Sequence, residues 1–263
     1  MTDDPHPGAA RKKLGLALGG GGARGMAHVG ILQVLAREGI PIDCIAGTSA
    51  GSLVGAAYAA GLGVDRLLEL ALDIRWRDLG RLVWPGDGLV SFDRMEAFLV
   101  GQLGDLSFAD LQIAYAAVAA DLDTGRQVIL RRGRLAPAVQ ASCSVPGLVT
   151  PVELDGRLLT DGGVVNNLPI SVVREMGADV VLAVGLGDPT TGRPHGARAI
   201  LLWAMERLLY RAGDDPATAD IFLPVPFEGF ASMVRTSLRH RFIARGRHLA
   251  EEALPQIRAA LQP

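Results

Sequence analysis

Two glycine-rich stretches decide the fold: residues 19–25 read GGGGARG and residues 47–51 read GTSAG. Each follows a short apolar run, Leu14 to Leu18 in the first case and Ile42 to Ala46 in the second, and each leads into a helix-like stretch. A buried strand that turns directly into a helix is the repeating unit of α/β proteins. The sequence therefore predicts two strand–turn–helix units, each with small residues at its turn.

The second turn exposes a serine in the setting of a nucleophile. In the pattern G-x-S-x-G the turn is sharp and crowded, so it presents the serine hydroxyl and admits only small neighbours. Gly47, Ala50 and Gly51 are the small residues around Ser49. The first turn supplies a complementary part, because free N–H groups of residues 20–22 at the start of a helix can stabilise an oxyanion. Together the two turns indicate acyl transfer.

The serine hydroxyl needs a base that accepts its proton. None of the five histidines lies in a setting that favours this role: His6, His28, His195, His240 and His248. The histidine at position 28 falls within the apolar stripe of the first helix, so we expect a packed side chain. Asp161 is the better candidate, because it directly follows an apolar strand and precedes Gly162 and Gly163, which permit close approach of another backbone.

The glycine loop by itself admits a second interpretation. Gly20, Gly22 and Gly25 also fit G-x-G-x-x-G, the pyrophosphate-binding pattern of dinucleotide-binding domains. Asp43 lies roughly where the ribose-binding acid of such a domain belongs. A dinucleotide-binding domain has no use for an exposed serine at the second turn. We therefore rank a dinucleotide-binding oxidoreductase below a serine hydrolase and keep it as an alternative.

Apolar runs alternate with helical patterns along most of the remaining chain. The patterns predict strands at residues 113–120, 127–130, 149–154, 157–160 and 180–184, and helices at 26–38, 53–60, 64–74, 199–212 and 242–261. Asp155-Gly156 between two of these runs is a strong hairpin signal. This alternation favours a three-layer α/β/α sandwich with a mostly parallel central sheet. We expect a flexible tail over residues 1–13 and one domain over residues 14–263.

The amino-acid composition restricts the classes of binding partner that we expect. The 263 residues carry a formal net charge of −2, with 49% hydrophobic and 21% charged residues. This balance is typical of a globular protein and gives no sign of a nucleic-acid partner. Cys44 and Cys143 suggest neither a disulfide framework nor a zinc site, and we expect no metal and no cofactor. No apolar run approaches the ~18 residues of a membrane span, so we expect a cytoplasmic protein.

Taken together, the motifs resemble those of the patatin-like phospholipase family, in its bacterial branch. The glycine loop, GTSAG and the D-G-G turn match that family's oxyanion loop, nucleophile elbow and catalytic aspartate block, and residues 141–147 and 166–169 match two further segments. The resemblance implies a serine–aspartate dyad without histidine. It assigns these roles: Ser49 as nucleophile, Asp161 as base, Gly20, Gly21, Gly22 and Arg24 at the oxyanion hole, and Gly25, Gly47, Gly51, Gly162 and Gly163 as motif glycines.

The function that this resemblance implies is lipid acyl hydrolysis. The substrates would be phospholipids, lysophospholipids or related acyl esters, cleaved through an acyl-enzyme intermediate. A catalytically idle regulatory protein of the same fold is the alternative. Arg24 has two interpretations: it orients the loop or binds a lipid phosphate, or it holds local structure through carbonyl contacts.

A peripheral contact with the inner face of the membrane is a further expectation. Residues 75–94 contain Trp76 and Trp84 and form either a surface connection or a mobile apolar flap, or lid, near the serine. Tryptophan suits the membrane interface, where its apolar body and polar tip are both satisfied. The C-terminal basic run could attract anionic headgroups, although it also fits a solvated helix face: Arg235, Arg239, Arg241, Arg245 and Arg247.

Overall fold

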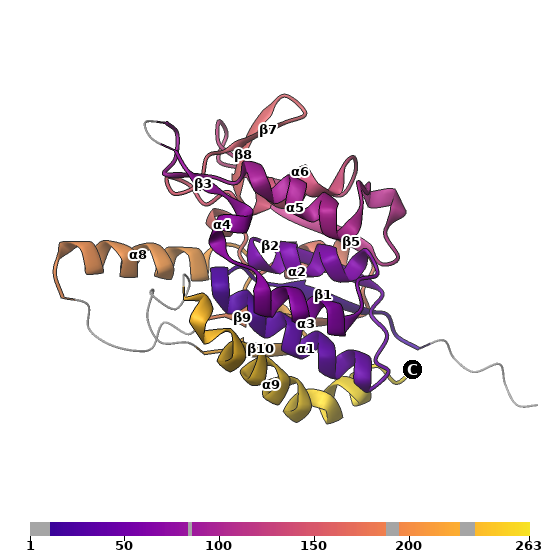
Figure 1. Cartoon of the computed structure of the whole chain (residues 1–263). Coiled ribbons are helices and arrows are strands. Elements are labelled where there is room, and N and C mark those ends of the chain that lie inside the picture. Colours follow the sequence, from indigo (N-terminus) through magenta and orange to yellow (C-terminus); the bar gives the residue numbers. More distant parts are fainter. Residues whose placement is uncertain (1–10, 84–85, 188–194, 227–234) are drawn as a thin grey trace, which may run out of the picture.

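The central sheet of this protein is built from its apolar runs (Figure 1). The computed structural model describes residues 11–83, 86–187, 195–226 and 235–263, and within these ranges eight strands form one sheet in the order β10-β9-β1-β2-β5-β8-β7, with β6 paired to β5. Their bounds are β1 Leu14–Leu18, β2 Cys44–Thr48, β5 Ala114–Asp121, β6 Gln127–Leu130, β7 Val152–Leu154, β8 Arg157–Asp161, β9 Val180–Leu186 and β10 Ile221–Val225. The first five strands in this order run parallel, whereas β6 and β8 pair antiparallel with β5. The predicted α/β fold with a mostly parallel sheet is confirmed.

Helices pack on both faces of this sheet, but unequally. Their bounds are α1 Met26–Arg37, α2 Ala50–Ala59, α3 Val64–Asp73, α4 Trp76–Leu79, α5 Asp93–Leu103, α6 Leu135–Ser142, α7 Ile170–Glu175, α8 Ala197–Arg211 and α9 Arg239–Ala260. One face carries the larger core, to which α1, α2, α6 and α9 contribute. The opposite core is formed by α7 and the residues just before it. The second helical layer is therefore thin in the described residues.

The difference between the two faces follows from the residue pattern of the central strands. Leu14, Leu16 and Leu18 of β1 belong to the larger core, and Ala17 belongs to the smaller one. At Gly15 an added Cβ would lie only 2.1 Å from Cγ1 of Val173, so α7 can lie this close only because the strand offers small residues there. Strands buried on both faces read as continuous apolar runs, as observed here.

Two predicted boundaries near the site are displaced. β2 begins at Cys44 and extends through Thr48, two residues later than expected at each end, because Gly47 and Thr48 continue the parallel pairing with β5. Asp43 stays outside the strand, where it accepts a hydrogen bond of 2.7 Å from the N–H of Leu14. The next helix starts at Ala50 rather than at residue 53, immediately after the predicted nucleophile.

The predicted tail and lid fall partly outside the described residues. Residues 1–10 and Trp84 lie outside them. Within the predicted tail, the Arg11 guanidinium contacts the Asp43 carboxylate at 2.7 Å, so residue 11 is tied to the body of the protein. Within residues 75–94, the strands β3 (Arg81–Leu82) and β4 (Val90–Ser91) form a short antiparallel pair. The lid remains a prediction.

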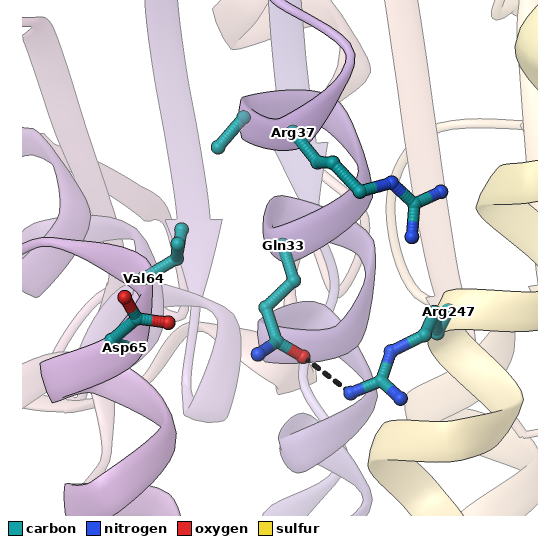
Figure 2. A pocket seen from close by; sticks show the side chains of 6 residues that line it. Gln33, Arg37, Val64, Asp65 and Arg247 are labelled. Atoms are coloured by element: carbon teal, nitrogen blue, oxygen red, sulfur yellow. Dashed lines mark hydrogen bonds between the residues drawn. The ribbon is translucent and has the colours of Figure 1, made fainter.

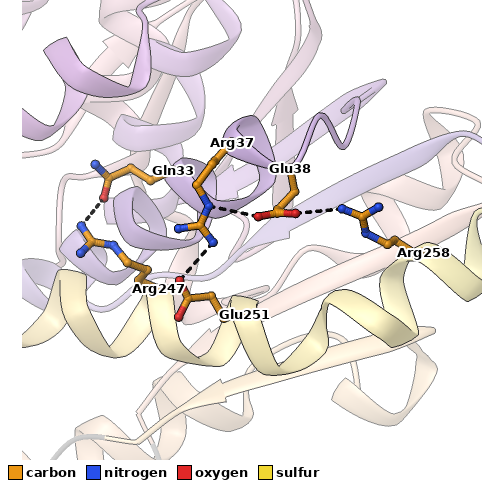
Figure 3. Close-up of polar contacts among 6 residues, drawn as sticks. All are labelled: Gln33, Arg37, Glu38, Arg247, Glu251 and Arg258. Atoms are coloured by element: carbon orange, nitrogen blue, oxygen red, sulfur yellow. Dashed lines mark hydrogen bonds and ion pairs between the residues drawn. The ribbon is translucent and has the colours of Figure 1, made fainter.

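Helix α9 packs along α1 by close backbone approach and by a band of polar contacts (Figure 3). An added Cβ at Gly246 of α9 would lie 2.0 Å from the carbonyl oxygen of Ala27, and one at Gly30 of α1 would lie 2.1 Å from that of Ile243. The polar contacts are exposed or half-buried, and each such ion pair stabilises by only ~0–1 kcal/mol. Those between the two segments are the ion pairs Arg37–Glu251 and Arg258–Glu38 and the hydrogen bond Arg247–Gln33, and Arg37 also pairs with its neighbour Glu38.

This packing predicts opposite effects of the same substitution in two helices. Gly246→Ala should lower the free energy of unfolding by about 1–3 kcal/mol, because the new methyl group meets a backbone oxygen. Gly101→Ala in α5, where an added Cβ has no neighbour within 4 Å, should raise it. The expected gain is about 0.5–1 kcal/mol. Urea unfolding measures both; an unchanged midpoint for Gly246→Ala would contradict the close contact.

Candidate active site

The ends of β2 and β8 meet on one edge of β5. Val118 of β5 is paired with Thr48 of β2 and, on its other side, with Ile129 of β6. The next residue, Ala119, is paired with Asp161 of β8 and again with β6 on the other side. Since β6 occupies the second edge of β5 at both positions, β2 and β8 must share the first edge. Their carboxyl ends therefore face each other there, and the chain leaves β2 at Ser49, one residue after Thr48.

A strained turn follows β2. Ser49 has φ 54° and ψ −122°, in the left-handed region that residues with a side chain rarely adopt. An added Cβ at Gly47 would lie 2.4 Å from the carbonyl oxygen of Gly51, and one at Gly51 would lie 2.0 Å from that of Leu18. Both glycines are required by these close approaches. The strain costs of order 1–3 kcal/mol and is typical of functional sites.

The structure places the Asp161 carboxyl next to the Ser49 side chain, at the facing ends of β8 and β2. The carboxyl is 4% exposed, and one of its oxygens accepts a hydrogen bond of 2.7 Å from the N–H of Gly163. Burial raises the pKa of Asp161 to about 6, against the lowering effect of the hydrogen bonds from Ser49 and Gly163. The carboxyl is thus a stronger base than an exposed aspartate and is still ionised at neutral pH.

His28 is a packed side chain, as expected, and it supports the glycine loop. It is fully buried, with its Nε2 at 2.9 Å from the carbonyl oxygen of Gly19. Because a carbonyl oxygen only accepts, Nε2 carries the proton. Burial lowers the pKa of His28 to about 4, so the ring is neutral at physiological pH.

The other histidines that the structure describes lie away from the predicted dyad. His195, His240 and His248 are exposed, and His248 lies 3.4 Å from Glu252 on the same helix. His6 lies outside the described residues. Within the described part of the chain, no hydrogen bond joins a histidine to the Ser49 or Asp161 side chain.

The glycine loop lies directly against the serine. An added Cβ at Gly20 would come within 3.0 Å of Cβ of Ser49. The N–H of Gly20, however, donates to the carbonyl of Asn167 at 3.1 Å, so this amide is committed within the fold. The N–H groups of Gly21 and Gly22 have no acceptor among the described residues. The loop therefore offers these two amides for an oxyanion, and Gly20 contributes by its close approach.

Arg24 is buried rather than turned to solvent. Its side chain is 2% exposed, and its guanidinium contacts the Glu206 carboxylate of α8 at 2.5 Å. Gly187 lies close by, since an added Cβ there would be 2.8 Å from Nη1 of Arg24. These contacts support a structural role in orienting the loop, and they leave the guanidinium poorly accessible to a lipid phosphate.

A buried polar segment holds both halves of the predicted dyad. The Ser142 hydroxyl accepts from the N–H of Ser49 at 3.0 Å and donates to the carbonyl of Val118 at 2.6 Å. Two residues on, the carbonyl of Ser144 accepts from the N–H of Asp161 at 2.8 Å. The sequence reasoning assigned no role to these residues. The available signal was a pair of serines, at positions 142 and 144, between apolar residues that pack into the core.

The position of Asp43 argues against dinucleotide binding. In dinucleotide-binding domains the ligand lies outside the carboxyl ends of the strands. Asp43 precedes β2 and so lies at the amino end, where it is held by Arg11 and by the N–H of Leu14. Its carboxylate cannot serve a ribose on the far edge of the sheet. The dinucleotide-binding interpretation therefore has no support from Asp43, the residue proposed to bind the ribose.

A separate groove lies between α1, α3 and α9 (Figure 2). It has a volume of about 490 Å³ and is lined by Gln33, Ala36, Arg37, Val64, Asp65 and Arg247. None of the predicted site residues lines it. Its α1 residues belong to the end of that helix, which returns to the amino edge of the sheet, opposite the glycine loop. Among the described residues, no group of three or more potential metal ligands is found.

Comparison with known proteins agrees with these motifs. A family model described as patatin-like phospholipase matches residues 16–174. An uncharacterized NTE family protein of Mycobacterium bovis is 39% identical over 193 residues, which are 72% of this chain and 53% of that protein. A putative patatin-like phospholipase domain-containing protein of Caenorhabditis elegans is 34% identical over 218 residues, 77% of this chain and 20% of that protein. This chain therefore spans about half the length of its mycobacterial relative.

Solved structures share the fold. VipD from Legionella pneumophila superposes with a TM-score of 0.64 at 14% identity, covering 95% of this chain and 68% of that one. The type III effector ExoU gives a TM-score of 0.53 at 14% identity, covering 95% of this chain and 54% of that one. At such identities the likeness bears on the fold alone. The family model, in contrast, covers more than half of the sequence and includes the glycine loop, the elbow and the D-G-G turn, and on this ground the chain belongs to the patatin-like phospholipase family.

Proposed function

We propose that this chain is a serine lipid acyl hydrolase that cleaves carboxylic ester bonds of phospholipids, lysophospholipids or related acyl esters. The observation that carries this proposal is the placement of Ser49 and a buried Asp161, whose pKa is raised to about 6, at the facing ends of β2 and β8. A carboxyl group with this pKa is ionised at neutral pH and basic enough to assist a hydroxyl. Family membership supports the class of reaction.

The proposed reaction has two half-reactions. Ser49 Oγ attacks the ester carbonyl carbon while the Asp161 carboxylate takes the hydroxyl proton, and the carbonyl oxygen becomes an oxyanion. The amides of Gly21 and Gly22 are the proposed donors to this oxyanion. Collapse of the intermediate expels the alcohol, which receives the proton from Asp161, and leaves an acyl ester on Ser49. A water molecule then attacks this ester while Asp161 takes its proton, and collapse of the second intermediate releases the fatty acid as Asp161 returns the proton to Ser49 Oγ.

Two energetically unfavourable features of the site favour a catalytic role for this chain over a purely regulatory one. Ser49 adopts a strained backbone conformation, and Asp161 is a buried carboxyl with a raised pKa. Both features destabilise the folded protein. A protein that only displays this fold to a partner gains nothing from either of them, whereas a hydrolase needs an exposed hydroxyl and a basic carboxylate. The following three experiments test the proposal.

Ser49→Ala should lower the hydrolysis rate by at least ~10³-fold, the scale for loss of a covalent step. The assay is a panel of lipid esters and short soluble esters, run in parallel with wild type. Thermal unfolding checks that the variant is folded. Turnover close to that of wild type in a folded variant would contradict the proposal.

Asp161→Asn should separate activity from stability. Activity should fall as far as in Ser49→Ala, because the two residues act as one unit. Since burial raises the folded pKa from 3.8 to about 6, the folded state binds the proton more tightly than the unfolded state, and wild-type stability falls as pH rises through this window. Asparagine does not titrate, so it removes this pH dependence. Compared with wild type, the free energy of unfolding of the variant should be higher by up to about 3 kcal/mol above about pH 7 and nearly unchanged near about pH 4.

Urea unfolding at both pH values measures this difference, and wild-type kcat/KM should rise with an apparent pKa near 6. An equal stability change at both pH values, or activity that is flat across this range, would refute the role of a buried base.

Ser142→Ala tests whether the buried segment positions the serine. It removes the acceptor for the N–H of Ser49, so kcat on a soluble ester should fall by up to about 100-fold, as expected for a displaced nucleophile. Ser144→Ala is the matched control, because the Ser144 side chain is equally buried but donates only to the carbonyl of Gln140. The control should retain kcat although it also loses a buried hydroxyl. If kcat falls equally in both variants, the loss reflects a general structural effect, and the positioning role of Ser142 is contradicted.

A further inference from the structure

Helix α8 carries large apolar side chains on its surface. It extends away from the body of the molecule in Figure 1. Leu201, Met205 and Leu208 are spaced by four and three residues, so they lie on one side of the helix. Leu201 is 61% exposed and Leu208 is 72% exposed. We call these three residues the α8 face; the exposed Trp203, two residues from Leu201, lies on the opposite side of the helix.

The base of α8 contacts both parts of the proposed active site. Glu206 forms the ion pair with buried Arg24 of the glycine loop. On the Asp161 side, Cδ2 of Leu209 lies 3.7 Å from where a Cβ on Gly163 would be. Val164, the residue after Gly163, is 42% exposed and adds apolar surface beside this contact. The α8 face is therefore part of the surface around the proposed site.

The charge of α8 indicates which partner suits this face. Residues 197–211 contain three arginines and one glutamate, and that glutamate is paired with Arg24. Arg207 lies 5.2 Å from the centre of the Trp203 ring, and Arg211 is exposed. An apolar stripe on a helix whose other sides carry arginines is typical of helices that lie on anionic lipid surfaces.

We propose that the α8 face docks this protein on an anionic lipid surface and so sets the proposed active site against the lipids that it cleaves. This inference rests on the proposed function for the identity of the substrate. The contact is peripheral, since no helix in the described residues is long and apolar enough to cross a bilayer. It differs from the sequence-based expectation, because part of the C-terminal basic run is used inside the fold: Arg247 bonds to Gln33 of α1.

The test compares two exposed leucines on different elements. Leu208→Glu lies in the α8 face, and Leu82→Glu, at a residue 84% exposed in β3, lies in the stretch that the sequence suggested for membrane contact. Flotation uses vesicles of phosphatidylcholine with or without phosphatidylserine. We expect wild type and Leu82→Glu to float with the anionic vesicles. Leu208→Glu should show a partition coefficient lower by about tenfold or more, as expected for loss of one buried leucine.

Hydrolysis of a short soluble ester is measured on the same samples and should be alike in all three proteins. If wild type fails to float, or if Leu208→Glu floats as wild type does, the docking proposal is wrong. If Leu82→Glu alone abolishes flotation, the contact lies in residues 75–94 instead. If light scattering shows a wild-type dimer that Leu208→Glu dissociates, the face is an interface between copies. If the wild-type protein does not hydrolyse the soluble ester, the proposed function is contradicted, whatever the flotation result.

Discussion

Thr48 and Asp161 occupy neighbouring positions along one edge of β5, and the rest of the site depends on this register. The pairing leaves no gap between the ends of β2 and β8, so the chain that leaves β2 must turn at once, and it turns at Ser49. The turn fits only because residues 47 and 51 have no side chain to collide with neighbouring backbone oxygens. A shift of either strand by one residue would turn alternate side chains to the other face of the sheet and separate the serine from the carboxyl.

Holding this arrangement costs stability, and the surrounding contacts offset the cost. The positive φ of Ser49 and the burial of the Asp161 carboxyl are both unfavourable for folding. Ser142 and the carbonyl of residue 144 accept hydrogen bonds from the backbone N–H groups of Ser49 and Asp161, and His28 and Arg24 contact the glycine loop. Such a protein should be easier to stabilise than to improve as a catalyst, because the groups that most destabilise the fold are those that the proposed reaction needs.

Much of this arrangement could be predicted from local sequence, because it depends on residues that are neighbours in the chain. The strand before each glycine-rich turn, the hairpin at Asp155-Gly156 and the burial of His28 all follow from short-range pattern. Contacts between distant segments were not predictable. The Arg24–Glu206 pair joins residues 182 positions apart, and Gly20 gives its amide to Asn167. The exposure of the apolar side chains of α8 was equally hidden, because an apolar helix is interpreted as a core helix until its surroundings are known.

The proposed reaction requires that the amides of the glycine loop receive the charge that develops when Ser49 attacks a carbonyl. A crystal structure of the protein after reaction with a fluorophosphonate measures this directly. The account predicts phosphorus bonded to Ser49 Oγ, with the phosphoryl oxygen at about 2.7–3.1 Å from the amide nitrogens of Gly21 and Gly22. Phosphorus on another residue, or a phosphoryl oxygen turned away from the loop toward solvent, would contradict it.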